Sequence, residues 1–427
     1  MFDVIIIGGG AAGFFTAIQI AEQNSDLKVA ILERGKTVLA KVKVSGGGRC
    51  NVTHAEFNPA DLVLNYPRGE KELLGPFHTF CTGDTMAFFE ERGVPLKIEE
   101  DGRIFPQSDS SQSIIDCFIN ETERLGIKVM KLCPVSNISY AVTDNPDLGF
   151  LVTTPKKEFQ TKKVVVATGS NPKIWNLLEG LGHTIIPPVP SLFTFNIKDS
   201  RITDIPGVST TARVTVFASK SNTTELSSKI KTAVRKKPLL EAEGPLLITH
   251  WGMSGPAILK LSAWGATLLH SKNYQFVVQV NWLPDMVPGA VLEYLSSVKE
   301  TDPKKTILRT KILDIPRRLW VNLVKAADID ETVKWAGATK TQLQNLADQL
   351  TESEFSVNGK STFKEEFVTA GGIDLKEVNF KTYESKIAKN LYFAGEVINV
   401  DAITGGFNFQ NAWTGGFMAA QAISKLG

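Results

Sequence analysis

The residues of this 427-residue chain that are best suited to chemistry lie in glycine-rich runs near its two ends. Gly8, Gly10 and Gly13 have the spacing Gly-x-Gly-x-x-Gly. In a turn between a strand and a helix, the first glycine permits a tight turn, the second lets the backbone approach a pyrophosphate, and the third allows close packing of helix on strand. The N–H groups that open such a helix then bind phosphate oxygens.

An acidic residue supports this interpretation. Glu33 ends the next apolar run, about 20 residues after the glycines, where a carboxylate accepts hydrogen bonds from a ribose diol. Without such an acid, a glycine-rich turn would explain the motif as well. The two features together predict a site for the ADP half of a dinucleotide, and they do not distinguish NAD from FAD.

A second glycine pair favours FAD. Leu391-Tyr-Phe-Ala-Gly-Glu396 is a short apolar run, and Thr404-Gly-Gly-Phe-Asn-Phe-Gln410 opens a helical pattern after it. A helix N-terminus stabilises the negative charge near N1 and the C2 carbonyl of a reduced flavin by up to about 2 kcal/mol. Asn408 and Gln410 can add polar contacts. We expect non-covalent FAD; the alternative, an NAD-dependent dehydrogenase, requires that this glycine pair merely caps a helix.

Two other segments have a similar small-residue character. Lys163-Val-Val-Val-Ala-Thr-Gly169 ends in a turn that can pass close to an adenosine or a pyrophosphate, although an ordinary strand-to-loop turn is an equal alternative. Ser45-Gly-Gly-Gly-Arg-Cys-Asn-Val-Thr53 can cradle a cofactor with its backbone. Within it, Arg49 can pair with phosphate, and we interpret Cys50 as a small core residue rather than a reactive thiol.

Secondary structure must bring these segments together. Residues 3–8 and 28–33 are continuous apolar runs, typical of strands buried on both faces, and residues 11–23 have helical periodicity. A long glycine-rich loop is expected from Gly35 to about His54. Other expected helices are at 83–92, 111–125, 291–298, 316–327, 341–350 and 406–425, and expected strands include 212–218 and 274–280.

Composition is typical of a globular protein with two or three domains, at 43% hydrophobic and 22% charged residues. The net charge of +2 gives no argument for a nucleic acid or an anionic membrane surface. None of the four cysteines is spaced as Cys-x-x-Cys, so we expect reduced thiols, no metal site and a cytoplasmic location. Glycines interrupt the apolar N-terminus, so membrane insertion is not expected.

The run from Ser45 to Thr53 resembles a signature of the BaiN-like, aminoacetone-oxidase-like family of bacterial NAD(P)/FAD-dependent oxidoreductases. The resemblance extends over nearly the whole chain and includes residues 8–13, 102–106, 244–256, 369–372 and 392–410. The sequence departs from it at His54 and Asn399, where the family usually has Asn and Asp.

The resemblance implies an α/β fold with a two-dinucleotide-binding, Rossmann-like FAD domain built from residues 1–190 and 366–427. A β-barrel-like domain, residues 191–284 and 353–365, and a small helical insertion, residues 285–352, lie between these two parts. The sequence pattern agrees, because the N-terminal strand and the C-terminal glycine pair must meet around one FAD.

The motifs and the resemblance together imply a set of FAD contacts spread over the first and last parts of the chain, with Val135 contacting adenine through its backbone. The set is Gly8, Gly10, Ala11, Ala12, Gly13, Glu33, Arg34, Lys41, Ser45, Gly46, Gly47, Arg49, Cys50, Asn51, Val135, Ala167, Thr168, Gly169, Gly395, Glu396, Asp401, Gly405, Gly406, Phe407, Asn408 and Gln410.

Two residues are candidates for catalysis. His250 lies in a Thr-His-Trp-Gly segment and can donate or accept a proton near neutral pH; a hydrogen-bonded structural histidine is an equal alternative. Arg103 can orient an anionic substrate, with a plain surface cation as the alternative. We expect a small-molecule substrate to enter between the FAD domain and the insertion, with His250 near the flavin.

The expected function is therefore hydride transfer through flavin N5 by an FAD-dependent oxidoreductase. Two chemistries stay open: NAD(P)H-fed reduction of a C=C bond, and amine oxidation with O₂. No second Gly-x-Gly-x-x-Gly follows a strand between residues 170 and 390, so NAD(P)H would bind only transiently. The non-enzymatic alternative is a flavin-binding sensor or a partner-regulated module without turnover.

Overall fold

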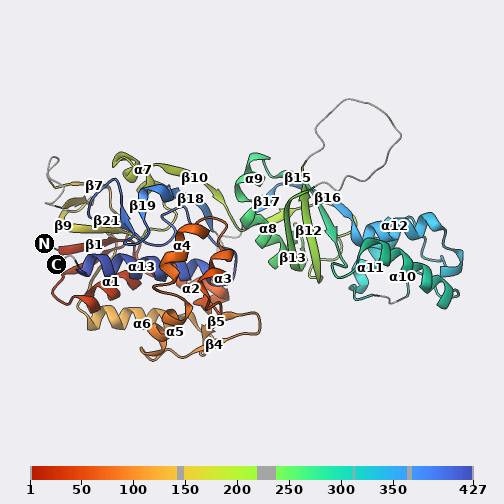
Figure 1. The fold of residues 1–427 in the computed structure, drawn as a ribbon, viewed down its shortest axis with the longest axis horizontal. Coiled ribbons are helices and arrows are strands. Elements are labelled where there is room, and N and C mark those ends of the chain that lie inside the picture. Colours follow the sequence, from red (N-terminus) through yellow and green to blue (C-terminus); the bar gives the residue numbers. More distant parts are fainter. Residues whose placement is uncertain (1, 142–148, 219–236, 311–312, 363–367, 426–427) are drawn as a thin grey trace. The chain divides into compact units, whose positions relative to one another are not determined.

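The computed structural model describes residues 2–141, 149–218, 237–310, 313–362 and 368–425. The chain divides into two compact units (Figure 1). The first unit is Met1–Pro190 with Lys364–Gly427, and the second is Ser191–Phe363. The second unit is therefore an insertion into the first.

A sheet with parallel central strands forms the core of the first unit. Its central order is β21 (Leu391–Phe393), β9 (Glu158–Val166), β1 (Phe2–Ile7), β2 (Val29–Leu32) and β6 (Lys128–Met130), all parallel. Antiparallel strands extend it: β19 (Val378–Asn379) and β20 (Glu384–Ser385) beyond β21, and β8 (Phe150–Thr153) with β7 (Asn137–Tyr140) beside β9. Residues 4–7, 29–32 and 164–166 are buried without alternation, as in strands covered on both faces.

Two helices from opposite ends of the sequence pack together beside this sheet. α1 (Ala11–Gln23) and α13 (Phe407–Lys425) lie side by side (Figure 1). A Cβ at Gly416 would lie 2.6 Å from the hydroxyl oxygen of Thr16, so glycine permits this close approach. α6 (Ser111–Arg124) also packs on α1.

Smaller elements complete the first unit. They are α2 (Ala40–Gly48), α3 (Pro59–Leu62), α4 (Glu70–Phe77), α5 (Thr82–Glu90), α7 (Pro172–Gly180), a small sheet of β3 (Thr53–His54), β5 (Arg103–Pro106) and β4 (Leu96–Ile98), and the pair β10 (Ile185–Pro190) with β18 (Thr369–Ile373). The expected loop from Gly35 to His54 is wrong in part, because α2 lies within it. Burial of Val42 anchors this helix, and the backbone leaves helical conformation at Ser45, Gly46 and Gly47.

The second unit is built on a seven-stranded antiparallel sheet. Its order is β16 (Ser353–Asn358), β15 (Gln275–Asn281), β12 (Ser209–Phe217), β13 (Pro238–Thr249), β14 (Gly252–Ser254), β11 (Thr194–Asn196) and β17 (Lys360–Ser361). Only Gly359 separates β16 from β17 in the chain, so the two ends of this order are continuous and the sheet is barrel-like. The helices are α8 (Pro256–Trp264), α9 (Ala266–Ser271), α10 (Pro288–Thr301), α11 (Arg317–Ala326) and α12 (Lys340–Thr351).

The predicted fold class, a Rossmann-like α/β part with an inserted antiparallel part, is confirmed. The expected helices correspond to α5, α6, α10, α11, α12 and α13, and the expected strands to β12 and β15. A separate helical domain at residues 285–352 stays a prediction. In the structure, the strands of the second unit and α10–α12 share one hydrophobic core. Within the described residues, no helix has the length and apolar character needed to cross a membrane.

Candidate dinucleotide site

The glycine motifs meet at one edge of the parallel sheet. Gly8 follows β1, Glu33 follows β2, residues 167–169 follow β9, and Gly395 lies just beyond β21. Because these strands are parallel neighbours, their carboxyl ends share an edge. Open α/β sheets bind ligands at this edge, where the strand order reverses, and here β1 has β2 on one side and β9 on the other.

The turn after β1 requires glycine at two positions and leaves open space at a third. A Cβ at Gly8, where φ is 114°, would lie 2.4 Å from the carbonyl oxygen of Ala167. A Cβ at Gly13 would lie 2.0 Å from the carbonyl oxygen of Gly8. A Cβ at Gly10 would meet no described atom within 4 Å, and no side chain caps α1 there. The N–H groups of this helix end are thus accessible to phosphate oxygens.

Two backbone groups orient the predicted ribose-binding carboxylate. Glu33 Oε2 accepts a hydrogen bond from the backbone N–H of Gly9 at 2.8 Å, and Oε1 accepts one from that of Gly35 at 2.6 Å. A carboxylate oxygen has a second lone pair, so both oxygens retain capacity to accept bonds from a diol.

The start of α13 is held against β3. At Gly406, where φ is 94°, a Cβ would lie 2.6 Å from the carbonyl group of Thr53. The His54 ring donates through Nδ1 to the carbonyl oxygen of Gly405 at 3.1 Å and stacks on Phe407, with 4.6 Å between ring centroids. This contact gives His54, one of the two residues that depart from the family resemblance, a role in positioning the helix start.

The side chains of Asn408 and Gln410 are occupied by protein partners. Asn408 bonds to both the N–H and the carbonyl oxygen of Ala402. Gln410 is fully buried, and its Oε1 accepts bonds from the hydroxyls of Thr53 at 2.6 Å and Thr85 at 2.9 Å. Cofactor contacts from these two positions stay predictions, and with both side chains engaged they would come from the backbone.

Three further predicted contacts take part in ion pairs. Asp401 is fully buried and pairs with the guanidinium of Arg68. Lys41 Nζ lies 2.7 Å from Glu396 Oε2, which joins α2 to the loop after β21. These pairs connect segments more than 300 residues apart around the sheet edge.

Two residues of the predicted set each have a buried polar atom without a hydrogen-bond partner among the described residues. They are Asn51 Oδ1, in the segment between α2 and β3, and Thr168 Oγ1, at the sheet edge after β9. Leaving a buried polar group unpaired costs about 1–3 kcal/mol, so native proteins rarely do so. Both residues belong to the predicted set. With the open space at Gly10, they fit a polar ligand such as a dinucleotide.

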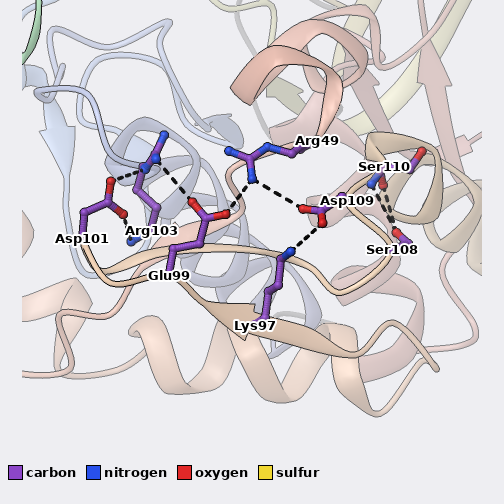
Figure 2. A network of polar contacts seen from close by, with 8 residues as sticks. All are labelled: Arg49, Lys97, Glu99, Asp101, Arg103, Ser108, Asp109 and Ser110. Carbon is purple, nitrogen blue, oxygen red and sulfur yellow. Dashed lines mark hydrogen bonds and ion pairs between the residues drawn. The ribbon is translucent and has the colours of Figure 1, made fainter.

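Arg49 and Arg103 join one polar network (Figure 2). Arg49 lies 2.6 Å from Glu99 and 3.5 Å from Asp109, and its guanidinium stacks on Phe105 at 3.9 Å from the ring centroid. Arg103 lies 2.7 Å from Asp101 and 3.3 Å from Glu99. Pairing with a phosphate or an anionic substrate stays a prediction for both, and such an anion would compete with these carboxylates.

Cys50 is a core residue, as interpreted from the sequence. Its side chain is fully buried, and this burial raises the pKa of the thiol to about 12, against the opposing effect of a hydrogen bond with Ser45. The thiol is therefore protonated near neutral pH.

The remaining predicted residues have varied environments. Ala11 and Ala12 form the first turn of α1, Val135 lies in the loop after β6, and Arg34 is exposed. His250 belongs to the second unit, in the exposed turn between β13 and β14. Its proximity to a flavin stays a prediction.

Sequence reasoning missed the partners of the predicted residues. Thr53 could have been predicted as a polar contact, because its hydroxyl ends the small-residue run from Ser45. Thr85, Arg68 and Phe105 carry no local signal. Their contacts depend on which helices and hairpins pack around residues 401–410 and Arg49.

Comparison with known proteins agrees with this geometry. The profile of the HI0933-like protein Rossmann domain family matches residues 2–422. The chain is 29% identical to the ribosomal RNA dihydrouridine synthase of Haemophilus influenzae, covering 99% of this chain and 98% of that protein. It is 26% identical to the 3-dehydro-bile acid delta(4,6)-reductase of Clostridium scindens, covering 98% of each.

A solved structure of the open conformation of a flavocytochrome c3 fumarate reductase is similar with a TM-score of 0.47 and 14% identity, over 99% of this chain and 78% of that one. The resemblance to a BaiN-like family is confirmed by the sequence relatives. The chain therefore belongs to the HI0933-like Rossmann-domain family and is an oxidoreductase.

Proposed function

We propose that this protein is an FAD-dependent reductase that saturates a carbon–carbon double bond conjugated to a carbonyl group. The observation that carries the cofactor assignment is the sheet edge itself. There the open space at Gly10, the oriented carboxylate of Glu33 and the unpartnered hydroxyl of Thr168 follow neighbouring parallel strands.

The names of the relatives favour reduction over amine oxidation. Dihydrouridine is uridine with the double bond of its ring saturated, and that bond is conjugated to a carbonyl group. The substrate of a 3-dehydro-bile acid delta(4,6)-reductase likewise has double bonds conjugated to an oxo group. Both names therefore describe the same bond change, in which one hydride and one proton are added across C=C.

The chain's own residues would bind and orient the cofactor. Backbone N–H groups at the start of α1 would bind the pyrophosphate, and Glu33 would accept hydrogen bonds from the ribose hydroxyls. The N-terminus of α13, held in place by Thr53 and His54, would favour negative charge on a bound cofactor through its helix dipole. Bound FAD supplies the hydride chemistry, with NAD(P)H as transient electron donor, and His250 stays our candidate for supplying the proton.

A pyrimidine in RNA is the substrate class that the charge distribution favours. From the net charge of +2 no nucleic-acid partner was expected, but the charge is distributed unequally between the two units. The second unit holds 22 Lys and Arg against 16 Asp and Glu, a net charge of +6, whereas the first unit holds 25 against 29, a net charge of −4. A basic unit is what binding to a phosphate backbone requires.

The test is anaerobic mixing of the purified protein with NADPH or NADH. Rapid bleaching of the flavin absorbance, followed by reoxidation on adding a conjugated enone or uridine-containing RNA, is expected for the reductase. A flavin that is stable to both nucleotides and forms peroxide from amines in air would favour the oxidase instead. A colourless protein that releases no flavin on denaturation would remove the cofactor assignment.

A further inference from the structure

The second unit contains a cavity of about 710 Å³ at one end of its sheet. The start of β12 lines it on one side. Residues 309, 310, 314–317 and 320, which include the start of α11, line it on the other. The volume lies within the range of about 300–1,000 Å³ that is typical of small-ligand sites. Neither the proposed reductase chemistry nor the predicted cofactor set uses these residues.

Two arginines provide the charge of this cavity. Arg309 and Arg317 both line it, and both are exposed. Among the described residues, neither guanidinium has an ion-pair or hydrogen-bond partner, in contrast to Arg49, Arg103 and Arg201, which pair with carboxylates. A guanidinium fork without a protein partner is well suited to the oxygens of a phosphate.

Hydrogen-bond donors complete the lining. Ser209, Thr210 and Thr211 contribute hydroxyls from the start of β12. The first turn of α11 also faces the cavity; its N-cap is Pro316, no side chain caps it, and its first turn holds no acidic residue. Its first N–H groups are therefore additional donors to an anion.

One carboxylate lowers the positive charge. Asp314 also lines the cavity, so two arginines stand against one aspartate among the described lining residues. The surplus of basic residues in the whole unit also favours a negatively charged ligand.

We propose that this cavity binds a backbone phosphate of an RNA chain, through Arg309 and Arg317. The ligand chemistry is a phosphate group, and the surplus of basic residues in the whole unit favours a diester of a polyanionic chain as its source. The proposal rests on the proposed function for its choice of RNA. Its test is a binding measurement that does not depend on the flavin.

The experiment compares the full-length protein with Arg309→Gln, Arg317→Gln and the control Arg318→Gln. Arg318 is the next residue in α11, carries the same charge, is exposed and does not line the cavity. Binding of a fluorescent, uridine-containing RNA hairpin is followed by anisotropy over a range of salt concentrations. Each cavity variant should weaken binding and reduce the slope of log K against log salt by about 1. Arg318→Gln should leave both quantities close to those of the parent protein.

Equal affinities and slopes for all three variants would overturn the proposal. So would arginine-dependent binding of inorganic phosphate, measured by calorimetry, without any binding of RNA. Flavin content and bleaching by NADPH are recorded for every variant. Cavity variants that lose RNA binding but keep both properties support the phosphate site. A protein without flavin that still binds RNA through these arginines would refute the reductase and leave the phosphate site supported.

Discussion

Gly13 in α1 packs directly on Gly8 in the preceding turn, so closely that a Cβ at Gly13 would lie 2.0 Å from the carbonyl oxygen of Gly8. Gly10, between them, has open space instead. The three glycines of the motif therefore have different roles. Two of them are required for the turn to fold, and the third leaves room for a ligand.

This difference gives a prediction for Gly10→Ala. Its backbone conformation, φ −96° and ψ −169°, is accessible to alanine, so the apoprotein should fold with an unchanged melting temperature. The added methyl group would occupy the space over the helix end, so FAD affinity should fall at least tenfold, or about 1.4 kcal/mol. Flavin retained after gel filtration and titration of the apoprotein measure this.

Gly75→Ala is the matched control, because a Cβ there also meets no described atom within 4 Å and the site is remote in sequence from the glycine motif. It should keep full flavin content. Equal flavin affinity for Gly10→Ala and Gly75→Ala would mean that no phosphate approaches the backbone at Gly10.

Thr85→Val should destabilise the fold around α13. The Thr85 hydroxyl donates to the fully buried Gln410 Oε1. Its loss leaves this buried amide oxygen with one hydrogen bond fewer. The expected cost is about 1–3 kcal/mol, measured as a shift of the urea unfolding midpoint. The exposed Thr79→Val should shift it by less than about 0.5 kcal/mol. Similar midpoints for the two variants would show that the buried bond contributes little.

Acid should destabilise the protein through His183. Burial lowers the pKa of His183 from its usual 6.5, although the hydrogen bond with Glu377 opposes the shift. The ring is neutral in the fold: Nδ1 lies 3.0 Å from Glu377, and Nε2 accepts from the Ser385 hydroxyl at 3.1 Å. As the pH falls through 6.5 towards the lowered pKa, the unfolded chain binds a proton that the folded chain does not, so stability decreases.

Urea unfolding at a series of pH values checks this prediction. His183→Gln should be less stable at neutral pH but should lose less stability between neutral and mildly acidic pH than the parent protein. The exposed His78→Gln is the control and should follow the parent. A parent-like pH dependence in His183→Gln would assign the acid sensitivity to other groups.

Cys50 should be unreactive in the folded protein. Its pKa of about 12 leaves almost no thiolate near neutral pH, and its side chain has no exposed surface. Iodoacetamide should therefore modify Cys50 only in denaturant, as detected by peptide mass spectrometry. Modification of the native protein at a rate close to that in denaturant would contradict the buried position.

Much of this site could be predicted from the sequence because its geometry is local. The spacing of Gly8, Gly10 and Gly13 encodes a turn that depends on residues a few positions apart, and Glu33 follows at a fixed distance along the same β-α-β unit. Helices such as α6 and α13 follow from periodicity. The loop expected around Ala40–Gly48 was partly wrong because burial of Val42 stabilises a helix that its glycines disfavour.

Only the tertiary structure decided which side chains are available to a ligand. Gln410 and Asp401, candidate cofactor contacts by sequence, are engaged by Thr53, Thr85 and Arg68, which lie more than 300 residues away in the chain. Arg49 is neutralised by a hairpin that it meets only in the fold. Glycine spacing determines the turn through backbone sterics, so it can be recognised in the sequence. Hydrogen-bond and ion-pair partners depend on long-range packing, which brings distant segments to the same edge of the sheet.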